Sequence, residues 1–433
     1  MNYYSTTDKN IQADFRSATL QGLSPDGGLY FPEHLAPLSP SFFQNIERYS
    51  REEIAGEVMR PFVGDTIPYS ELEKILAQTI DFPFPLLPFH VNTWALELFH
   101  GPTLAFKDVG ARFMSRCLGY FVRNDERETI VLVATSGDTG GAVASGFYDV
   151  PGIRVVILFP KGKVSAIQEL QLTTPGKNIQ ALSIDGNFDD CQRMVKEAFR
   201  DEELKKHLKL TSANSINVAR WLPQQIYFFL AYQQWNKSYG SPVISVPSGN
   251  FGNLCAGLLA YQRGLPVQQF IAACNANDVL GHFLETGEYL PHEAIATVSN
   301  AMDVGDPSNF TRMLHLFEGQ VDTLKTILKS DSYTDTSVKA IIKKAYNDHG
   351  YTLDPHGAVA YLALETYLSG HKEQKGFFLE TAHPIKFNDI VEAEINSPLP
   401  FPPSIQALLH QPAKSTEMDT EYHSLRAYLQ EQV

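Results

Sequence analysis

The chain has 433 residues, of which 43% are hydrophobic and 19% charged, and its formal net charge is −14 at pH 7. This composition is typical of a globular protein, and the length predicts two or three domains. The acidic balance, without a basic stripe, excludes nucleic acid as a partner, and no apolar run approaches the ~20 residues that a membrane-spanning helix needs.

The predicted elements change in character near residue 90. Residues 1–90 show helix and loop patterns and end in a proline-rich stretch. Beyond it, β-branched and apolar runs alternate with helical patterns, which predicts an α/β fold of parallel sheets flanked by helices. The predicted strands are 94–98, 130–134, 154–159, 179–184, 243–246, 270–274 and 376–380. The tail beyond Pro398 is predicted to wrap around the surface.

One lysine has an unusual setting. Lys107 follows the apolar run 104–106 and precedes a helical pattern in which apolar residues recur at spacings of three and four, from Val109 to Tyr120. At the positive end of a helix dipole and partly desolvated, its amine is expected to hold its proton less tightly than usual. A neutral amine can form a Schiff base with an aldehyde. For a lone lysine, the alternative is a solvated surface charge.

A predicted anion site lies at residues 247–253. This Gly-, Ser- and Asn-rich loop follows the strand 243–246 and precedes a helix predicted over 254–262. Main-chain amides and the helix dipole bind anions at such a loop, although an ordinary βα connection is the alternative. Walker and dinucleotide-binding patterns are absent, so a single phosphate fits better than a pyrophosphate. The predicted contacts are Ser248, Gly249, Asn250, Phe251, Gly252 and Asn253.

A second loop with the same design follows the strand 130–134. Its residues Thr135, Ser136, Gly137, Asp138 and Thr139 are predicted to bind a carboxylate through hydroxyl and amide groups. The chain thus carries a candidate Schiff-base lysine, a phosphate site and a carboxylate site. Pyridoxal phosphate chemistry on an amino acid needs all three, because the aldehyde and phosphate of the cofactor and the carboxylate of the substrate must each be held.

Six motifs together resemble threonine synthase, most closely its shorter bacterial and fungal branch, and they span most of the chain. They are HGPTLAFKD at 100–108, ATSGDTG at 134–140, SANSIN at 212–217, PSGNFG at 247–252, SNAMD at 299–303 and TAHPIKF at 381–387. The stretch 19–32 resembles the opening of that branch's N-terminal region.

The resemblance implies a tryptophan-synthase-β-like fold, the fold type II of pyridoxal phosphate enzymes. Such a fold has two parallel-sheet α/β domains with the cofactor in the cleft between them, here preceded by a mainly helical N-terminal region. The implied domains are the N-terminal region 1–90, a smaller domain 91–210 with the cofactor lysine and carboxylate loop, and a larger domain 211–433 with the phosphate loop and C-terminal tail.

The activity implied by the resemblance is conversion of O-phospho-L-homoserine and water to L-threonine and phosphate, with pyridoxal 5'-phosphate as cofactor and no metal. Lys107 would hold the cofactor and act as base at Cα. Thr381 matches the residue that faces the pyridine nitrogen, where a neutral hydroxyl restrains delocalised carbanions; a hydroxyl capping a backbone group is the alternative. Asp138 has two open roles, shaping the carboxylate loop or approaching the phenolic oxygen of the cofactor.

The departing phosphate of the substrate needs its own cation. Arg220 is the best candidate, with Ser215 and Asn217 as hydrogen-bonding companions, because a guanidinium group matches phosphate at two points. The alternatives are Arg112, Lys161 and Lys163.

The same motifs leave two other functions open, and the cysteines and N-terminus predict the cellular location. A dehydratase or phospho-lyase of the same fold, releasing a 2-oxo acid, would share most motifs, whereas a non-catalytic relative would not be expected to keep Lys107 in an unbroken motif. Four widely spaced cysteines without a C-x-x-C pair indicate reduced thiols, and the polar N-terminus lacks a signal pattern. The predicted location is the cytoplasm, and the predicted assembly is a monomer or homodimer.

Overall fold

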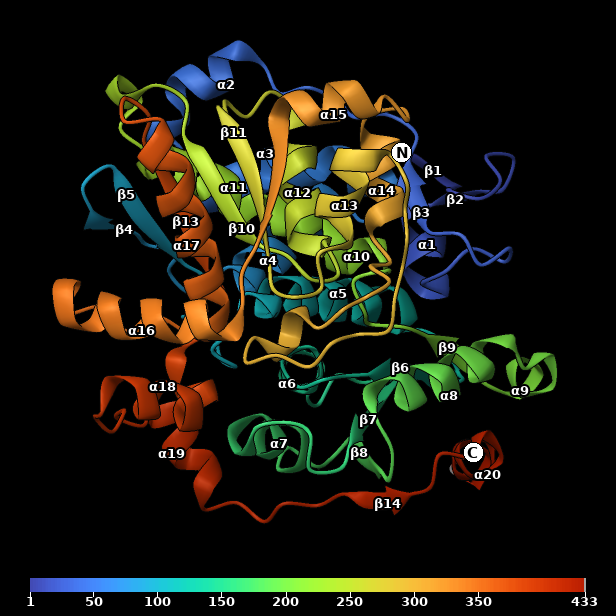
Figure 1. The fold of residues 1–433 in the computed structure, drawn as a ribbon. Helices are drawn as coiled ribbons and strands as arrows, with labels where there is room; N and C mark the ends of the chain where they lie inside the picture. Colours follow the sequence, from blue (N-terminus) through green and yellow to red (C-terminus); the bar gives the residue numbers. More distant parts are fainter. Residues whose placement is uncertain (432–433) are drawn as a thin grey trace.

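Three sheets organise the fold (Figure 1), and the computed structural model describes residues 1–431. The largest sheet has the order β12-β11-β10-β13-β5-β4, and all its neighbours are parallel except the β4–β5 pair. Its strands are β4 Leu86–His90, β5 Thr93–Glu97, β10 Val243–Pro247, β11 Gln269–Cys274, β12 Leu328–Ser332 and β13 Gly376–Glu380.

The second sheet is parallel throughout and has the order β14-β8-β7-β6-β9. Its strands are β6 Thr129–Ala134, β7 Ile153–Pro160, β8 Ile179–Ile184, β9 Lys209–Thr211 and β14 Thr416–Met418. Every residue of β6 is buried, which explains its continuous apolar sequence, because helices cover both faces of a parallel sheet. In Figure 1 this sheet lies below the large one, with the C-terminal helix α20 (Tyr422–Glu431) at its edge.

The N-terminal region contains a small antiparallel sheet that the sequence patterns do not predict. Its order is β2-β1-β3, formed by β1 Asn2–Ser5, β2 Gln12–Asp14 and β3 Tyr30–Pro32. Apart from β4 at its end, the rest of this region consists of helices and loops, as predicted, with α1 Phe15–Gln21, α2 Pro40–Asn45, α3 Arg51–Val63 and α4 Tyr69–Thr79. Strands of three or four residues are too short to show a period in the sequence.

The helices that bound the functional site begin close to the strand ends. They are α5 Lys107–Val122, α6 Asp138–Gly146, α8 Phe188–Arg200, α10 Val218–Trp221, α12 Gly252–Gln262 and α17 Pro355–Gly370. The start of α5 is fixed by Asp108, whose carboxylate accepts hydrogen bonds from the amide (2.9 Å) and hydroxyl (2.6 Å) of Thr103. α12 is apolar on all sides because it is enclosed by the core.

Further helices cover the sheets and connect them. The α-helices are α7 Ala166–Thr173, α9 Glu202–His207, α11 Gln225–Gln234, α13 Val279–Thr286, α14 Phe310–Leu316, α15 Val321–Ile327, α16 Asp335–His349, α18 Asn388–Ile395 and α19 Pro403–Leu409. The 3-10 helices are η1 Ile46–Arg48, η2 Gly64–Thr66, η3 Leu222–Gln224, η4 Lys237–Tyr239, η5 Asn300–Met302 and η6 Pro384–Phe387.

All the predicted strands are confirmed, but the predicted domain boundaries 1–90, 91–210 and 211–433 do not match the sheets. β4 and β5 belong to the large sheet, although one precedes residue 91 and the other was expected in the smaller domain. β14, in the predicted larger domain, pairs with β8 of the smaller sheet. A strand pattern shows that a segment is extended, but its partner is chosen by contacts distant in sequence. The C-terminal tail therefore completes the smaller sheet as well as crossing the surface.

Candidate active site

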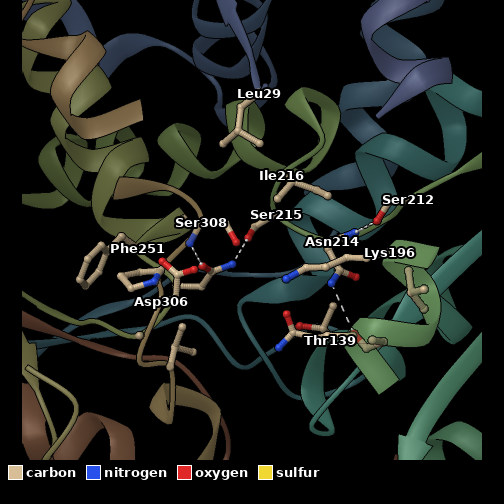
Figure 2. A pocket seen from close by; sticks show the side chains of 18 of the residues that line it. Leu29, Thr139, Lys196, Ser212, Asn214, Ser215, Ile216, Phe251, Asp306 and Ser308 are labelled. Atoms are coloured by element: carbon tan, nitrogen blue, oxygen red, sulfur yellow. Dashed lines mark hydrogen bonds between the residues drawn. The ribbon is translucent and has the colours of Figure 1, made fainter. Parts of the chain in front are cut away.

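A cavity of about 1610 Å³ lies at the carboxyl ends of β6 and β10. This exceeds the roughly 300–1,000 Å³ of an ordinary small-molecule pocket, so a cofactor and a substrate have room together. The loops after both strands and the start of α5 line it, as expected for ligands of open α/β sheets. Figure 2 shows hydroxyl, amide and cationic side chains converging on it, among them Ser215, Asn214, Thr139 and Lys196.

Lys107 reaches this cavity from the first position of α5. Leu104, just before it, has a left-handed backbone (φ 58°). The segment is then fixed by two main-chain hydrogen bonds: the amide of Phe106 donates to the carbonyl of Thr381 (2.9 Å), and the amide of His383 donates to the carbonyl of Leu104 (3.0 Å). Lys107 and Thr381, distant in sequence, are therefore held on adjoining segments, and both line the cavity.

The protein around Lys107 weakens its hold on the proton. Burial lowers the pKa of the Lys107 amine to about 8. The carboxylate of Asp138 opposes this lowering, whereas the positive charges of Lys386 and Arg220 add to it. The sequence-based expectation of an easily lost proton is confirmed in direction. At a pKa near 8 the amine can be neutral, and hence nucleophilic, close to neutral pH.

The loop after β10 keeps its amide groups available. Phe251 is left-handed (φ 57°) immediately before α12 begins at Gly252, and such backbone alternation forms a concave nest of amides. Within residues 1–431, the main-chain amides of 249–253 donate to no other group. Gly249 is required by packing, since a Cβ there would lie 2.6 Å from Cα of Met302. The cavity lining includes residues 249–253.

Ser248 is the exception among the predicted phosphate contacts. It is fully buried, its hydroxyl donates to the carbonyl of Val246 (2.7 Å), and it is absent from the cavity lining. Asn253 also has a structural bond, from its side-chain amide to the carbonyl of Pro247 (2.8 Å). Both side chains shape the turn, and the loop offers an anion its main chain.

The loop after β6 is organised around its own groups. The hydroxyl oxygen of Thr135 accepts hydrogen bonds from the amides of Gly137 (3.0 Å) and Gly140 (2.8 Å). Gly137 has a φ of 136°, and a Cβ there would lie 2.3 Å from the side chain of Gln168. Gly137 is outside the cavity lining, whereas Thr135, Ser136, Asp138 and Thr139 belong to it. The loop therefore presents side chains, while part of its main chain is already paired.

Asp138 forms an internal ion pair that no sequence pattern predicts. Its Oδ1 lies 2.7 Å from Nζ of Lys386 and accepts a hydrogen bond from Gln168 (2.9 Å). Burial alone would raise the pKa of Asp138, but the charges of Lys386 and Lys107 bring it well below the usual range. The only available signal was Lys386 itself, a lysine in the apolar run Pro-Ile-Lys-Phe of a recognised motif.

The short helix α10 contributes a buried guanidinium group. Arg220 is 3% exposed and lines the cavity; it donates to the carbonyl of Ala213, while its Nε has no hydrogen-bond partner. Burial lowers the pKa of Arg220 to about 10, which leaves it charged. Ser215 also lines the cavity, and its hydroxyl accepts from the side-chain amide of Asn250 (3.0 Å).

The structure does not bring the remaining phosphate candidates to the cavity. Asn217 caps α10 and donates to the carbonyl of Thr19 (2.9 Å), so its role is structural. Arg112 pairs with Asp81, and Lys161 pairs with Glu417. Neither these two cations nor Lys163 lines the cavity. Of the cationic candidates named from the sequence, Arg220 is the one that does.

Comparisons with known proteins agree with this geometry. Residues 2–80 match the family described as threonine synthase N terminus, residues 85–377 match pyridoxal-phosphate dependent enzyme, and residues 357–429 match threonine synthase, C-terminal. A threonine synthase from Haemophilus influenzae is 43% identical over 433 residues, covering 99% of each chain.

Solved structures give the same result. The crystal structure of threonine synthase from Escherichia coli has 41% identity and a TM-score of 0.94, covering 100% of each chain. The PLP-bound threonine synthase from Brucella melitensis has 33% identity and a TM-score of 0.93, covering 100% of this chain and 99% of the other. The chain therefore belongs to the threonine synthase family and is a pyridoxal-phosphate-dependent enzyme.

Proposed function

We propose that the substrate is O-phospho-L-homoserine and that the products with water are L-threonine and inorganic phosphate. The observation that carries this proposal is the buried guanidinium of Arg220, which forms no ion pair within residues 1–431, in the cavity that Lys107 also lines. A buried positive charge without an ion-pair partner is costly unless an anionic ligand meets it. A phosphate dianion is the ligand that a guanidinium group binds best at two points.

The residues present fit the cofactor. The free amides of 249–253, at the start of α12, would hold its phosphate, Lys107 would take its aldehyde, and Thr381 would face the ring nitrogen. Pyridoxal phosphate, when bound, supplies an aldehyde that links to amines and a ring that withdraws electrons from the attached carbon. Thr381 offers that nitrogen a neutral hydroxyl, which favours the restrained withdrawal expected from the resemblance.

Lys107 would serve as the proton carrier of the reaction. The conversion requires loss of protons at Cα and Cβ, departure of the γ-phosphate, protonation at Cγ, addition of the hydroxyl of water at Cβ and return of a proton to Cα. An amine with a pKa near 8 can both accept and return protons near neutral pH, so one group suffices for several of these transfers. Arg220 would hold the phosphate as its charge develops.

The loop after β6 would hold the substrate carboxylate. Ser136 and Thr139 line the cavity, and no described hydrogen bond uses their hydroxyls, unlike that of Thr135, whose oxygen accepts two loop amides. The carboxylate of Asp138 would repel a substrate carboxylate were it not neutralised by Lys386. This arrangement gives Asp138 a role in shaping the loop.

We also place the enzyme in the cytoplasm. All four cysteines, Cys117, Cys191, Cys255 and Cys274, are free and buried, which fits a reducing compartment. None of the helices in residues 1–431 is long and apolar enough to cross a membrane.

Identification of the product tests the proposed reaction. The purified protein, loaded with pyridoxal phosphate, is supplied with O-phospho-L-homoserine, and the amino or oxo acid formed is identified by mass spectrometry. Threonine formed in equal amount with phosphate is expected. A 2-oxo acid as the main product would show the alternative, a phospho-lyase, and turnover of serine or threonine in preference to phosphohomoserine would show a dehydratase.

A further inference from the structure

A second, fully buried lysine acts on the reactive one, in addition to neutralising Asp138. Lys386, in η6, is 0% exposed, and its Nζ contacts Oδ1 of Asp138 (2.7 Å) and the carbonyl oxygen of Thr103 (3.0 Å). Among the ion pairs within residues 1–431, only Lys386–Asp138 and His356–Asp354 have both side chains buried. Burying an ion pair brings a desolvation cost that can exceed its attraction, so stability alone is a weak reason for it.

The pair is positioned to control the charge next to Lys107. Asp138 begins α6 and lines the same cavity as Lys107, and its Oδ1 is occupied by Lys386 and Gln168. No described side chain donates to its Oδ2. The charged groups that act on Lys107 are Asp138 from α6, Lys386 from η6 and Arg220 from α10. Without Lys386, Asp138 would be a buried anion whose nearest cationic partner is Lys107.

We propose that Lys386 is a positioning residue for the reactive lysine: by neutralising Asp138 it prevents a lasting ammonium–carboxylate pair between Lys107 and Asp138, and so leaves the Lys107 amine free to react with the cofactor aldehyde. This inference rests on the proposed role of Lys107. It also explains why an acidic residue can occupy a loop that meets an anionic substrate, since the loop carries no net charge at that point.

The proposal predicts an order for three variants. Lys386→Met exposes Lys107 to an uncompensated carboxylate, so its proton is held more tightly than in the wild type. Asp138→Asn leaves Lys386 uncompensated, so the proton is held less tightly. The double variant removes both charges and returns Lys107 to near the wild-type behaviour. A purely structural role for the contact between Lys386 and Thr103 would not be repaired by the second substitution.

Competitive acetylation of the cofactor-free protein measures this order directly. Each variant reacts with a trace of acetic anhydride over roughly pH 6 to 10, and mass spectrometry follows the peptide that contains Lys107, which gives its titration midpoint. In Lys386→Met the midpoint should rise by about one pH unit, so the neutral fraction near pH 7 should fall about tenfold. Lys161→Met, which removes an exposed ion pair, is the matched control and should leave the midpoint unchanged.

The outcomes separate this inference from the proposed function. An unchanged or lower midpoint in Lys386→Met, or a double variant no closer to wild type than the single one, overturns the inference. If Lys386→Met does not fold, Lys386→Gln, which keeps a hydrogen-bond donor, is measured in its place against the same expectation. The measurement uses cofactor-free protein, so it stands whether or not phosphohomoserine proves to be the substrate.

Discussion

The two loops at the ends of β6 and β10 have similar sequences and different structures. Each follows a buried parallel strand, is rich in Gly, Ser, Thr, Asn or Asp, and leads into a helix. After β10, the amides of 249–253 donate to no described group, and a left-handed Phe251 turns the chain into α12. After β6, the Thr135 hydroxyl oxygen accepts two loop amides, and Asp138 is paired with Lys386.

A Gly-, Ser- and Asn-rich pattern therefore predicts a turn, but it does not predict which main-chain amides of the turn lack hydrogen-bond partners. A loop whose amides lack partners can bind an anion through the main chain, as the phosphate of a cofactor requires. In the loop after β6, Thr135 holds the amides of Gly137 and Gly140, and the side chains of Ser136 and Thr139 line the cavity. This contrast supports the proposal that the loop after β10 holds the cofactor phosphate and the loop after β6 holds the substrate carboxylate.

The largest effect is expected at Lys107, where the two loops converge. Lys107→Ala removes the amine that would hold the cofactor and move protons, so threonine formation should fall by about 10³-fold or more. Threonine production is measured beside a circular dichroism spectrum that checks the fold. Lys161→Ala, at an exposed ion pair, is the control and should be fully active. A variant that still formed threonine near the wild-type rate would disprove the assignment of Lys107.

Arg220 is expected to bind the phosphate group of the substrate and not its amino and carboxylate groups. Arg220→Ala removes a charge-assisted, two-point contact of about 1.5–3 kcal/mol, which corresponds to roughly 10- to 150-fold in kcat/KM for phosphohomoserine. Arg220→Lys should recover only part of this, because an ammonium group is a point charge. Spectral titrations with phosphohomoserine and a phosphate-free analogue provide the check. Equal weakening for both ligands would mean that Arg220 supports the cavity generally.

Substitution of Gly249 tests the loop after β10, whose main-chain amides lack hydrogen-bond partners. In Gly249→Val the new Cβ would lie 2.6 Å from Cα of Met302, a main-chain atom that cannot rotate away, so the loop must move and cofactor retention should fall about tenfold or more. Occupancy after dialysis is the measurement. Gly370→Val, at a glycine with no atom within 4 Å of its Cβ position, should retain the cofactor normally. Equal cofactor occupancy in wild type and Gly249→Val would show that the loop after β10 does not hold the cofactor.

The pKa of Lys107 predicts how cofactor incorporation depends on pH. The amine reacts when neutral, and its pKa is lowered to about 8, so the neutral fraction rises with pH and levels off above that value. The rate of incorporation into cofactor-free protein should therefore increase by up to about tenfold per pH unit below pH 8. Stopped-flow absorbance at several pH values measures the rate. A rate independent of pH below 8 would contradict the assignment.

Substitution of Gly137 tests the loop after β6, in which Thr135 holds two amides, and it should have the smallest effect on the reaction. Its φ of 136° and a contact of 2.3 Å from a Cβ to the Gln168 side chain predict strain in Gly137→Ala of about 1–3 kcal/mol. The expected result is a lower midpoint of urea unfolding with cofactor occupancy retained. Loss of the cofactor without loss of stability would instead indicate that this loop, too, binds through its main chain.

Much of the fold is predictable because its strands have a local signature. β6, β10 and β13 are fully buried and mostly apolar, and each stands out from the helices around it. β4, with a proline at its centre, and the three-residue β14 lack that signature. Their places in the two sheets depend on contacts with strands distant in the chain, so the domain boundaries could not be drawn from sequence patterns.

The site, too, contains residues that the sequence predicts correctly and residues that it does not. Lys107 and Thr381 stand in motifs whose residue types suit their chemistry, Arg220 follows the motif 212–217, and all three line one cavity. Asn217 looks equally suitable in the sequence, yet its side chain caps α10 and contacts α1. The Asp138–Lys386 pair joins two motifs that are far apart along the chain. Which polar groups face a ligand and which satisfy each other is decided by packing, which the sequence does not display.

Amide hydrogen exchange tests the contrast between the two loops most directly. Exchange is followed in the cofactor-free protein and after loading with pyridoxal phosphate, in peptides that cover 248–254 and 135–141. We expect loading to slow exchange strongly at 249–253, whose amides lack partners, and to change little at Gly137 and Gly140, whose amides Thr135 already holds. Slowing confined to the loop after β6, with the loop after β10 unchanged, would contradict this expectation.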